Sequence, residues 1–162
     1  MTTQEQRLST LVLGPEESRT KEPLDVLGQP ALVKLAGADT ADTVAVVHVT
    51  APKMTGPPLH RHSREDEWFY VLEGEIVTEV DGKRTTAGAG ASAFAPRGTV
   101  HTFQNFKDEP AKLLVMVTPA ALDRFFEELT EMNKGLSQPD FARIAELMTS
   151  YGMEILGPPL ME

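Results

Sequence analysis

Cysteine is absent from the 162-residue chain, and basic residues are scarce relative to acidic ones. Without cysteine there can be no disulfide, no thiolate metal site and no cysteine nucleophile. The 15 Lys and Arg residues stand against 24 Asp and Glu residues, which gives a formal net charge of -9 at pH 7. Because an acidic surface repels phosphate backbones and anionic lipids, we expect the protein to bind neither nucleic acids nor membrane surfaces.

The chain also has no apolar stretch long enough to cross a bilayer. Its first ten residues lack the cationic and then apolar pattern of a secretory signal, so we expect a cytoplasmic location. Hydrophobic residues make up 41% of the sequence, which is ordinary for a globular protein. The length suffices for one packed domain.

Composition and turn residues divide the chain into three parts. Residues 1–23 are polar and rich in charge, and we predict an N-terminal arm. Residues 24–118 contain many short apolar runs separated by turn residues, which predicts a β-barrel. Residues 119–162 change to a helical period, which predicts a helical appendage packed on the barrel.

Two runs in the central part carry specific strand signals. Glu75–Val80 alternates and is followed by Asp81-Gly82, which is a strong hairpin signal. Leu113–Val117 is apolar throughout, which predicts a strand covered on both faces. The other predicted strands include Ala31–Leu35, Thr43–Thr50, Trp68–Leu72, Ser92–Ala95 and Val100–Gln104.

Two C-terminal helices are predicted from apolar stripes at helical spacing. In the first helix, Thr118 is the expected N-cap and Pro119 the first helical residue. The second follows the capping pattern Ser137-x-x-Asp140. The two stripes consist of Leu122, Phe125, Phe126, Leu129 and Met132, and of Phe141, Ile144, Met148 and Tyr151. We assign the Phe125 and Phe126 stripe to packing on the barrel or to a dimer contact.

Three of the four histidines lie between Gly56 and Asn105. His60 and His62 are two residues apart, so on a strand they point to the same face. Glu67 follows five residues later, and His101 stands beyond a Pro-x-Gly turn that directs its strand back inward. Three imidazoles and a carboxylate form a mixed N/O set that suits one divalent transition metal, with Fe, Mn, Ni, Co, Cu and Zn all open.

The spacing of these residues resembles the two motifs of the cupin superfamily. The first motif is read as His60-x-His62, four residues, Glu67, six residues and Gly74. The second is read as Gly90, five residues, Pro96-x-Gly98, two residues, His101, three residues and Asn105. One position departs from the family pattern, which places a glycine where this chain has Met54, whereas the chain carries Gly56.

Within this superfamily, residues 24–160 are similar to the small single-domain quercetin dioxygenase-like cupins. The resemblance implies an all-β jelly-roll barrel, or double-stranded β-helix, with two C-terminal α-helices. It also implies a homodimer and the metal ligands His60, His62, Glu67 and His101.

Residues near the motifs are candidates for a substrate pocket. Phe69, Val71 and Phe103 are placed to line it if Glu67 and His101 face inward, and they would serve equally as barrel core. His48 either lines the cavity or has a structural role. Asn105 shares the face of Phe103 by the two-residue period.

Three charged residues are placed outside this ligand set. Glu65 and Asp66 adjoin Glu67, and we expect both at the solvated mouth of the barrel. Arg97 sits in a turn, where we expect it to face solvent.

The ligand set and the apolar pocket candidates favour a metal-dependent dioxygenase of an aromatic or enol-bearing small molecule. By resemblance to the flavonol-cleaving enzymes, Glu67 also takes the substrate proton. Two alternatives stay open: a non-redox cyclase or isomerase that uses the metal as a Lewis acid, and a protein that binds a small molecule without turnover. The sequence does not fix the metal or the substrate.

Overall fold

The computed structural model describes residue 8 and residues 10–162. Residues 1–7 and 9 of the predicted N-terminal arm lie outside the described residues. Residues 10–23 run in turns and bends before the first strand. The backbone oxygens of Gly14, Pro15 and Glu17 accept hydrogen bonds from Lys34 Nζ, which fastens this segment to the barrel.

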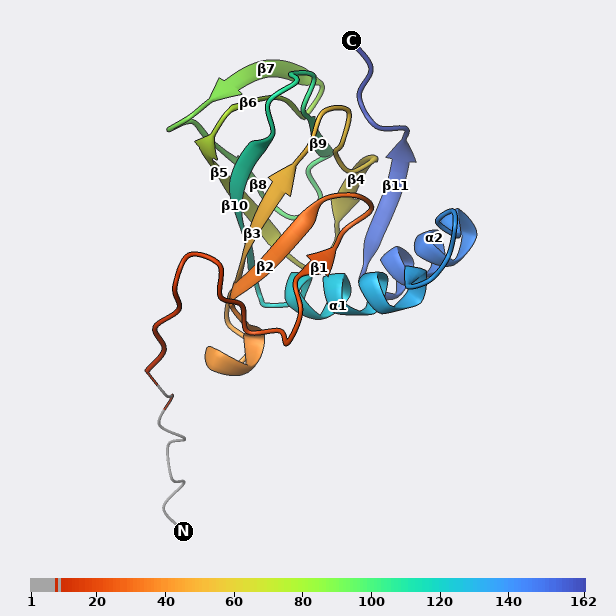
Figure 1. The fold of residues 1–162 in the computed structure, drawn as a ribbon. Helices are drawn as coiled ribbons and strands as arrows, with labels where there is room; N and C mark the ends of the chain where they lie inside the picture. Colours follow the sequence, from red (N-terminus) through yellow and green to blue (C-terminus); the bar gives the residue numbers. More distant parts are fainter. Residues whose placement is uncertain (1–7, 9) are drawn as a thin grey trace.

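Two antiparallel β-sheets form a barrel within the described residues (Figure 1). The first sheet consists of β1 (Leu24–Asp25), β2 (Pro30–Leu35), β3 (Ala45–Ala51), β5 (Asp66–Glu73), β8 (Ser92–Ala95) and β10 (Ala111–Thr118). The second consists of β4 (Leu59–His62), β6 (Glu75–Val80), β7 (Lys83–Gly88), β9 (His101–Gln104) and β11 (Met153–Gly157). A short 3-10 helix, η1 (Gly37–Asp39), links β2 to β3. The strand orders are β1-β2-β3-β10-β5-β8 and β11-β4-β9-β6-β7, and the predicted all-β jelly-roll barrel is confirmed.

The barrel core follows the two-residue period of β-strands. Val47 of β3 lies opposite Val115 of β10, which lies opposite Phe69 of β5. These three side chains are 0%, 3% and 1% exposed. The intervening residues Leu114 and Met116 are only half-buried, on the outer face. The prediction that Leu113–Val117 is covered on both faces is therefore wrong for the isolated chain.

The hairpin predicted at Asp81-Gly82 is confirmed. β6 ends directly before these two residues and β7 begins directly after them. Asp81 and Gly82 have φ angles of 51° and 76°, in the left-handed region that two-residue hairpin turns require.

The two predicted C-terminal helices are confirmed as α1 (Leu122–Asn133) and α2 (Phe141–Ser150). They lie beside each other at one end of the barrel, next to β1 and β11 (Figure 1). The N-cap of α2 is Asp140, whose side chain accepts a hydrogen bond from the Arg143 N–H, and not Ser137, where the Ser137-x-x-Asp140 pattern places it.

The predicted start of α1 is wrong. Thr118 is the last residue of β10, and its hydroxyl donates to the carbonyl oxygen of Thr43 at 2.9 Å instead of capping the helix. The N-cap of α1 is Ala121, so Pro119 lies in the connection and not in the helix. Pairing with Asp66 of β5 and the hydrogen bond to Thr43, in the loop before β3, thus hold the residue that the local sequence assigns to the helix.

One strand is missing from the sequence-based assignment. β11 pairs with β4 and places Met153 opposite His62 and Ile155 opposite His60. The C-terminal segment therefore contributes a strand to the second sheet as well as two helices. Its sequence, MEILG, gives too short and too irregular an alternation to predict a strand.

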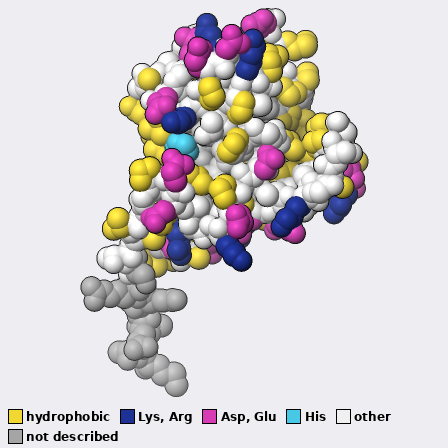
Figure 2. Space-filling view, in the orientation of Figure 1, with side chains coloured by type: hydrophobic (Ala, Val, Ile, Leu, Met, Phe, Trp, Pro, Cys, Tyr) yellow, Lys and Arg dark blue, Asp and Glu magenta, His cyan; other side chains and the backbone are white. Residues whose placement is uncertain are grey.

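Charged side chains of both signs are distributed over the surface. On the face drawn in Figure 2, basic side chains are scattered among acidic and apolar ones. Within the described part of the chain, no helix has both the length and the hydrophobicity to cross a membrane. The expectation that the protein binds neither nucleic acids nor membrane surfaces stays a prediction.

Gly56 lies where the chain approaches the backbone of β9. A Cβ atom built on Gly56 would collide with the carbonyl oxygen of Phe103. Backbone atoms in a strand cannot move aside as a flexible side chain can. The glycine displaced from the family pattern therefore still has a physical role, because it permits this close approach.

We predict that Gly56→Ala lowers the free energy of unfolding by about 1–3 kcal/mol, because overpacking at a fixed contact forces the backbone to shift. Gly88→Ala is the matched control, since a Cβ atom at Gly88 meets nothing within 4 Å. Urea denaturation measures both variants. Equal stability of the two would contradict the prediction.

Candidate metal centre

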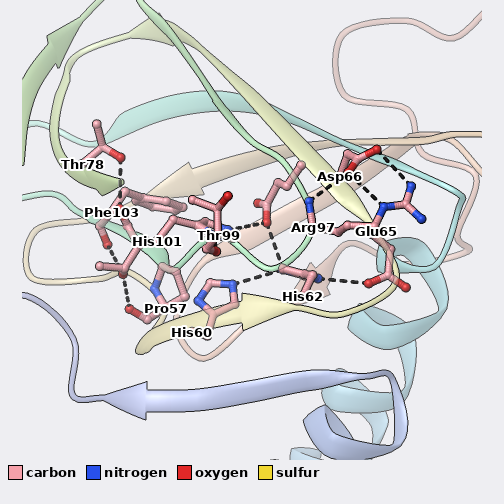
Figure 3. Close-up of polar contacts among 12 residues, drawn as sticks. Pro57, His60, His62, Glu65, Asp66, Thr78, Arg97, Thr99, His101 and Phe103 are labelled. Atoms are coloured by element: carbon pink, nitrogen blue, oxygen red, sulfur yellow. Dashed lines mark hydrogen bonds and ion pairs between the residues drawn. The ribbon is translucent and has the colours of Figure 1, made fainter. Parts of the chain in front are cut away.

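Four side chains from both sheets converge inside the barrel (Figure 3). His60 and His62 lie on β4, His101 lies on the neighbouring strand β9, and Glu67 comes from β5 of the other sheet. Alternate residues of a strand share a face, so His60 and His62 point inward together. The strand register places His101 opposite His60. All four residues are buried, and their potential ligand atoms lie within 4.8 Å of one another.

The atoms that face one another are the imidazole Nε2 atoms and one carboxylate oxygen. His60 Nε2 lies 3.1 Å from His62 Nε2. Glu67 Oε2 lies 3.0 Å from His62 Nε2 and 2.8 Å from His101 Nε2. Two ligands at right angles on a metal with bonds of about 2.1 Å are themselves about 3.0 Å apart. The observed distances therefore match the spacing of atoms around one transition-metal ion.

Each imidazole is held at its other nitrogen by an oxygen atom. Nδ1 of His60 donates to the carbonyl oxygen of Pro58 at 2.8 Å, and Nδ1 of His101 donates to that of Thr99 at 2.9 Å. Nδ1 of His62 lies 3.2 Å from Glu65 Oε2. A neutral imidazole with its proton on Nδ1 has a lone pair on Nε2. When the rings are deprotonated at Nε2, as metal ligands must be, the three Nε2 lone pairs point at a common position.

The charges of these groups also favour a cation. Burial, together with the charge on His101, lowers the pKa of His60 to about 4. Burial disfavours the charged form of His62 too, but hydrogen bonds to Glu65 and Glu67 outweigh it and raise the pKa of His62 to about 9. Burial would raise the pKa of Glu67, yet hydrogen bonds from His101 and His62 hold it well below its usual range. The buried carboxylate therefore requires positive charge beside it, which a divalent cation can supply.

The donor set fits a divalent transition metal, because it combines imidazole nitrogen and carboxylate oxygen without a thiolate. Affinity for such a set rises along the first-row metals toward copper and falls at zinc. The identity of the metal therefore depends on supply and geometry, and it stays open.

Glu65 corrects one prediction from the sequence. Its expected place at the solvated mouth is wrong, because the residue is 5% exposed and its carboxylate contacts His62 Nδ1. The chain bends at Ser63 and Arg64, so the two-residue alternation does not continue from β4 into β5.

Asp66 is half-buried and forms an ion pair of 3.0 Å with Arg97, whose own side chain is about half exposed.

A cavity of about 610 Å³ opens beside this cluster. His60, His62 and Glu67 form part of its wall, and most of the remaining wall is apolar. The apolar part comes from the barrel (Val49, Phe103, Val115), from α1 (Leu122, Phe125, Phe126, Leu129), from α2 (Phe141, Ile144, Met148) and from β11 (Met153, Ile155). Its volume lies in the range of about 300–1,000 Å³ that is typical of small-molecule sites.

The aromatic and aliphatic pocket candidates divide between cavity and core. Phe103 lines the cavity. Phe69 and Val71 are buried in the barrel core and are not among the lining residues, although the Phe69 ring lies 6.0 Å from that of Phe103. Phe125 and Phe126 of α1 line the cavity in addition to packing on the barrel.

Neither His48 nor Asn105 belongs to the cavity wall. His48 lies opposite Leu114 at an outward position of β3, so its candidate role in the pocket is wrong. Asn105 is fully buried, and its Nδ2 donates to the carbonyl oxygens of Ala51 and Glu109 at 2.8 and 2.9 Å. Its side chain joins the end of β3 to the loop before β10 and is not free to contact a ligand.

Sequence reasoning misses several parts of the cavity wall. Gln29, in the turn between β1 and β2, lines the cavity without any local signal in the sequence. Pro57 and Pro58 also line it, and their position directly before the first histidine motif is a signal that could identify them. Met153 is missed because β11 is missed.

Replacing Glu65 by Ala is expected to weaken metal binding by about 10–100-fold, because the group that orients His62 is lost. Glu65→Gln keeps an oxygen that can accept the His62 Nδ1–H but lacks the charge, so a smaller loss is expected. Titration with Co²⁺ against a competing chelator, followed by visible absorption, measures the affinity.

The control for these variants is Glu73→Gln, which removes an exposed carboxylate that pairs with Lys112 on the outer face. It should bind Co²⁺ as the wild type does. Wild-type affinity in Glu65→Ala would show that packing alone orients His62.

Comparisons with known proteins agree with this geometry. The tetracenomycin polyketide synthase protein TcmJ of Streptomyces glaucescens is 29% identical over 62 residues, which are 38% of this chain and 42% of that protein. The quercetin 2,3-dioxygenase of Bacillus subtilis is 33% identical over 76 residues, which are 47% of this chain and 23% of the enzyme. The chain thus spans less than half the length of these curated relatives.

A solved structure shares the fold over most of the chain. It is an RmlC-like cupin from Shewanella frigidimarina, with a TM-score of 0.59 at 23% identity, over 72% of this chain and 96% of that one. The family model of the cupin domain matches residues 47–117, which contain all four residues of the cluster. The chain therefore contains a cupin domain over residues 47–117 and shares the cupin fold.

Proposed function

We propose that the protein is a metal-dependent dioxygenase of an aromatic or enol-bearing small molecule. The observation that carries the proposal is the position of His60, His62 and Glu67 in the wall of an otherwise largely apolar cavity of about 610 Å³. A molecule with an apolar body fits this wall, and a hydroxyl group on that molecule can reach the cluster. Enols and phenols combine these two properties.

The metal would be held by Nε2 of His60, His62 and His101 and by the carboxylate of Glu67. When bound, it supplies Lewis acidity and, if it is redox-active, the one-electron steps that dioxygen chemistry requires. The His62 ring is further oriented by Glu65, which lies 3.2 Å from its Nδ1.

Glu67 is the group placed to take the proton of the substrate hydroxyl. It lines the cavity, and hydrogen bonds from His101 and His62 hold its pKa well below the usual range, so it is ionised. An ionised carboxylate within hydrogen-bond reach is a competent general base.

The two helices shield the reacting groups from water. Phe125 and Leu129 of α1 and Met148 of α2 are each at most 5% exposed, and all three line the cavity. Exclusion of water strengthens the electrostatic contacts of the cluster and protects a reactive intermediate from hydrolysis. Similarity to the quercetin 2,3-dioxygenase of Bacillus subtilis supports an oxidative reaction, although only 23% of that enzyme is covered.

A non-redox reaction is the second candidate. It is favoured by the similarity to TcmJ, whose name assigns it to a polyketide synthase. In that case the same cavity would hold a polyketide, and the metal would act only as a Lewis acid. A protein that binds such a molecule without turnover is the third candidate.

Oxygen uptake distinguishes the three candidates. We expect protein loaded with Fe, Mn, Ni, Co or Cu to consume O₂ in the presence of flavonols, diketones or catechol-like phenols. Glu67→Gln should lower the rate at least about 100-fold, because both a ligand and the proton acceptor are altered, whereas Glu73→Gln should leave it unchanged.

Three outcomes would contradict the dioxygenase proposal. Substrate conversion that continues without O₂, with zinc alone, would select the non-redox reaction. Tight binding with unchanged ligand recovered would select a binding protein. Absence of oxygen uptake with all of these compounds and all of these metals would reject the dioxygenase.

A homodimer is also proposed, formed through the outer face of the first sheet. The register places Val46, Met116, Trp68 and Phe94 in one row across β3, β10, β5 and β8. Phe94 is 57% exposed, and the Trp68 ring stacks on that of Tyr70 at 5.8 Å. An apolar row of this kind is usually covered, and a second copy of the chain would cover it.

A cytoplasmic location stays a prediction.

We expect the wild type to elute as a dimer in size-exclusion chromatography with light scattering. Phe94→Glu should yield a monomer, because it places a charge in the apolar row. Met54→Glu is the control, since Met54 is 54% exposed and lies outside this row. A wild-type monomer would contradict the proposal.

A further inference from the structure

Gln29 is a buried polar residue in the wall of the cavity. It lies in the turn between β1 and β2, where the backbone groups of Val26 and Gln29 bond to each other in both directions, at 2.9 and 3.2 Å. Pro30 follows directly and begins β2. The backbone of Gln29 is therefore fixed, although the residue belongs to a turn. The residue is 5% exposed and lines the same cavity as His60, His62 and Glu67.

The side-chain oxygen of Gln29 has no hydrogen-bond partner. Its Nε2 donates to the carbonyl oxygen of Val26 at 3.4 Å, whereas Oε1 is buried and unpaired. Four buried side-chain oxygens are unpaired among the described residues, and that of Gln29 is the one that lines the cavity beside the cluster. Buried polar atoms are nearly always paired, so this oxygen requires an explanation.

The surroundings of Gln29 favour a ligand over an isolated water molecule. A buried water is held by about two to four polar partners. The lining residues from the turn and from the facing helix α1 are apolar, namely Val26, Leu27, Phe125 and Leu129. A molecule that fills the apolar cavity can instead be held by its body and present one donor to the oxygen.

We propose that Gln29 is a specificity-determining residue whose Oε1 accepts a hydrogen bond from an O–H or N–H group of the substrate. The inference rests on the proposed function only in taking this cavity as the substrate site. Gln29 has no hydrogen bond to the cluster, so its ligand group is a second one, separate from the hydroxyl that reaches His60, His62 and Glu67. The substrate class is thus an apolar, aromatic-sized molecule with two polar groups.

Such a contact selects strongly between substrates. A site built to bond a donor leaves its own buried oxygen unpaired when an analogue lacks that donor, so the analogue binds less well. The apolar lining provides affinity for many aromatic molecules, and Gln29 would discriminate among them.

The test uses two probes that differ by one hydroxyl group, naphthalene-2,6-diol and naphthalen-2-ol. Protein loaded with Zn²⁺ and kept without O₂ binds them without oxidation, and calorimetry gives each dissociation constant. We expect the wild type to bind the diol about tenfold more tightly than the mono-ol. In Gln29→Met, which keeps the side-chain length, the two constants should become equal within about twofold.

Thr130→Val is the matched control on the facing helix. Its hydroxyl accepts a hydrogen bond from the Asp25 N–H at 3.1 Å and does not line this cavity. The variant loses a polar group that bonds to β1, the strand directly before the turn of Gln29, yet it should keep the tenfold preference for the diol.

A second measurement uses only the wild-type protein, so it does not depend on whether Gln29→Met folds. In ¹H–¹⁵N spectra of the wild type, the side-chain amide signal of Gln29 should shift with the diol and not with the mono-ol. Equal shifts with both probes, or a preference for the diol that survives in Gln29→Met, would overturn the inference and show that the oxygen does not bond to the ligand. Failure of both probes to bind would overturn it as well.

The outcome is separable from that of the proposed function. Binding to the Zn²⁺-loaded protein reports recognition, whereas oxygen uptake reports the reaction. Loss of the diol preference in Gln29→Met, together with no oxygen uptake by any loaded form, would retain Gln29 as a specificity residue and reject the dioxygenase.

Discussion

The structure depends on one electrostatic constraint, which is the meeting of three imidazoles and a carboxylate in the interior of the barrel. Pro58, Glu65 and Thr99 each provide an oxygen for an Nδ1 atom, so the Nε2 atoms point at one another. Two unprotonated Nε2 atoms 3.1 Å apart repel each other unless a proton or a cation lies between them. The backbone and Glu65 thus hold the site in a form that only positive charge stabilises.

The same constraint joins the two sheets. His60, His62 and His101 come from the second sheet and Glu67 from the first, so a bound cation would connect the two halves of the barrel at a position that lacks apolar packing. The apolar core lies elsewhere, in rows such as Val47, Val115 and Phe69. The apolar core that stabilises the fold and the cluster that could bind a metal therefore occupy different parts of the barrel interior.

The three histidines could be predicted from strand and turn geometry, whereas Glu67 is identified by its spacing in the cupin-like motif. His60 and His62 share a strand face, and a Pro-x-Gly turn directs the strand of His101 inward. Glu65 could not be predicted, since the bend after His62 interrupts the alternation. The orientation of His48 depends on the register of β3 against β10, which a one-residue shift inverts. The strand β11 could not be predicted because its pairing with β4 is long-range.

The cupin family model covers the metal-ligand cluster but only part of the cavity wall. The cupin family model matches residues 47–117, which contain the cluster and much of the barrel. The remaining wall comes from outside that range, from the turn at Gln29, from α1 and α2, and from β11. A barrel of this fold can therefore hold a metal in the same way while the flanking segments change what reaches it. In this chain those segments combine helix aromatics with one unpaired amide oxygen, so the choice of substrate is determined by residues that the barrel motifs do not include.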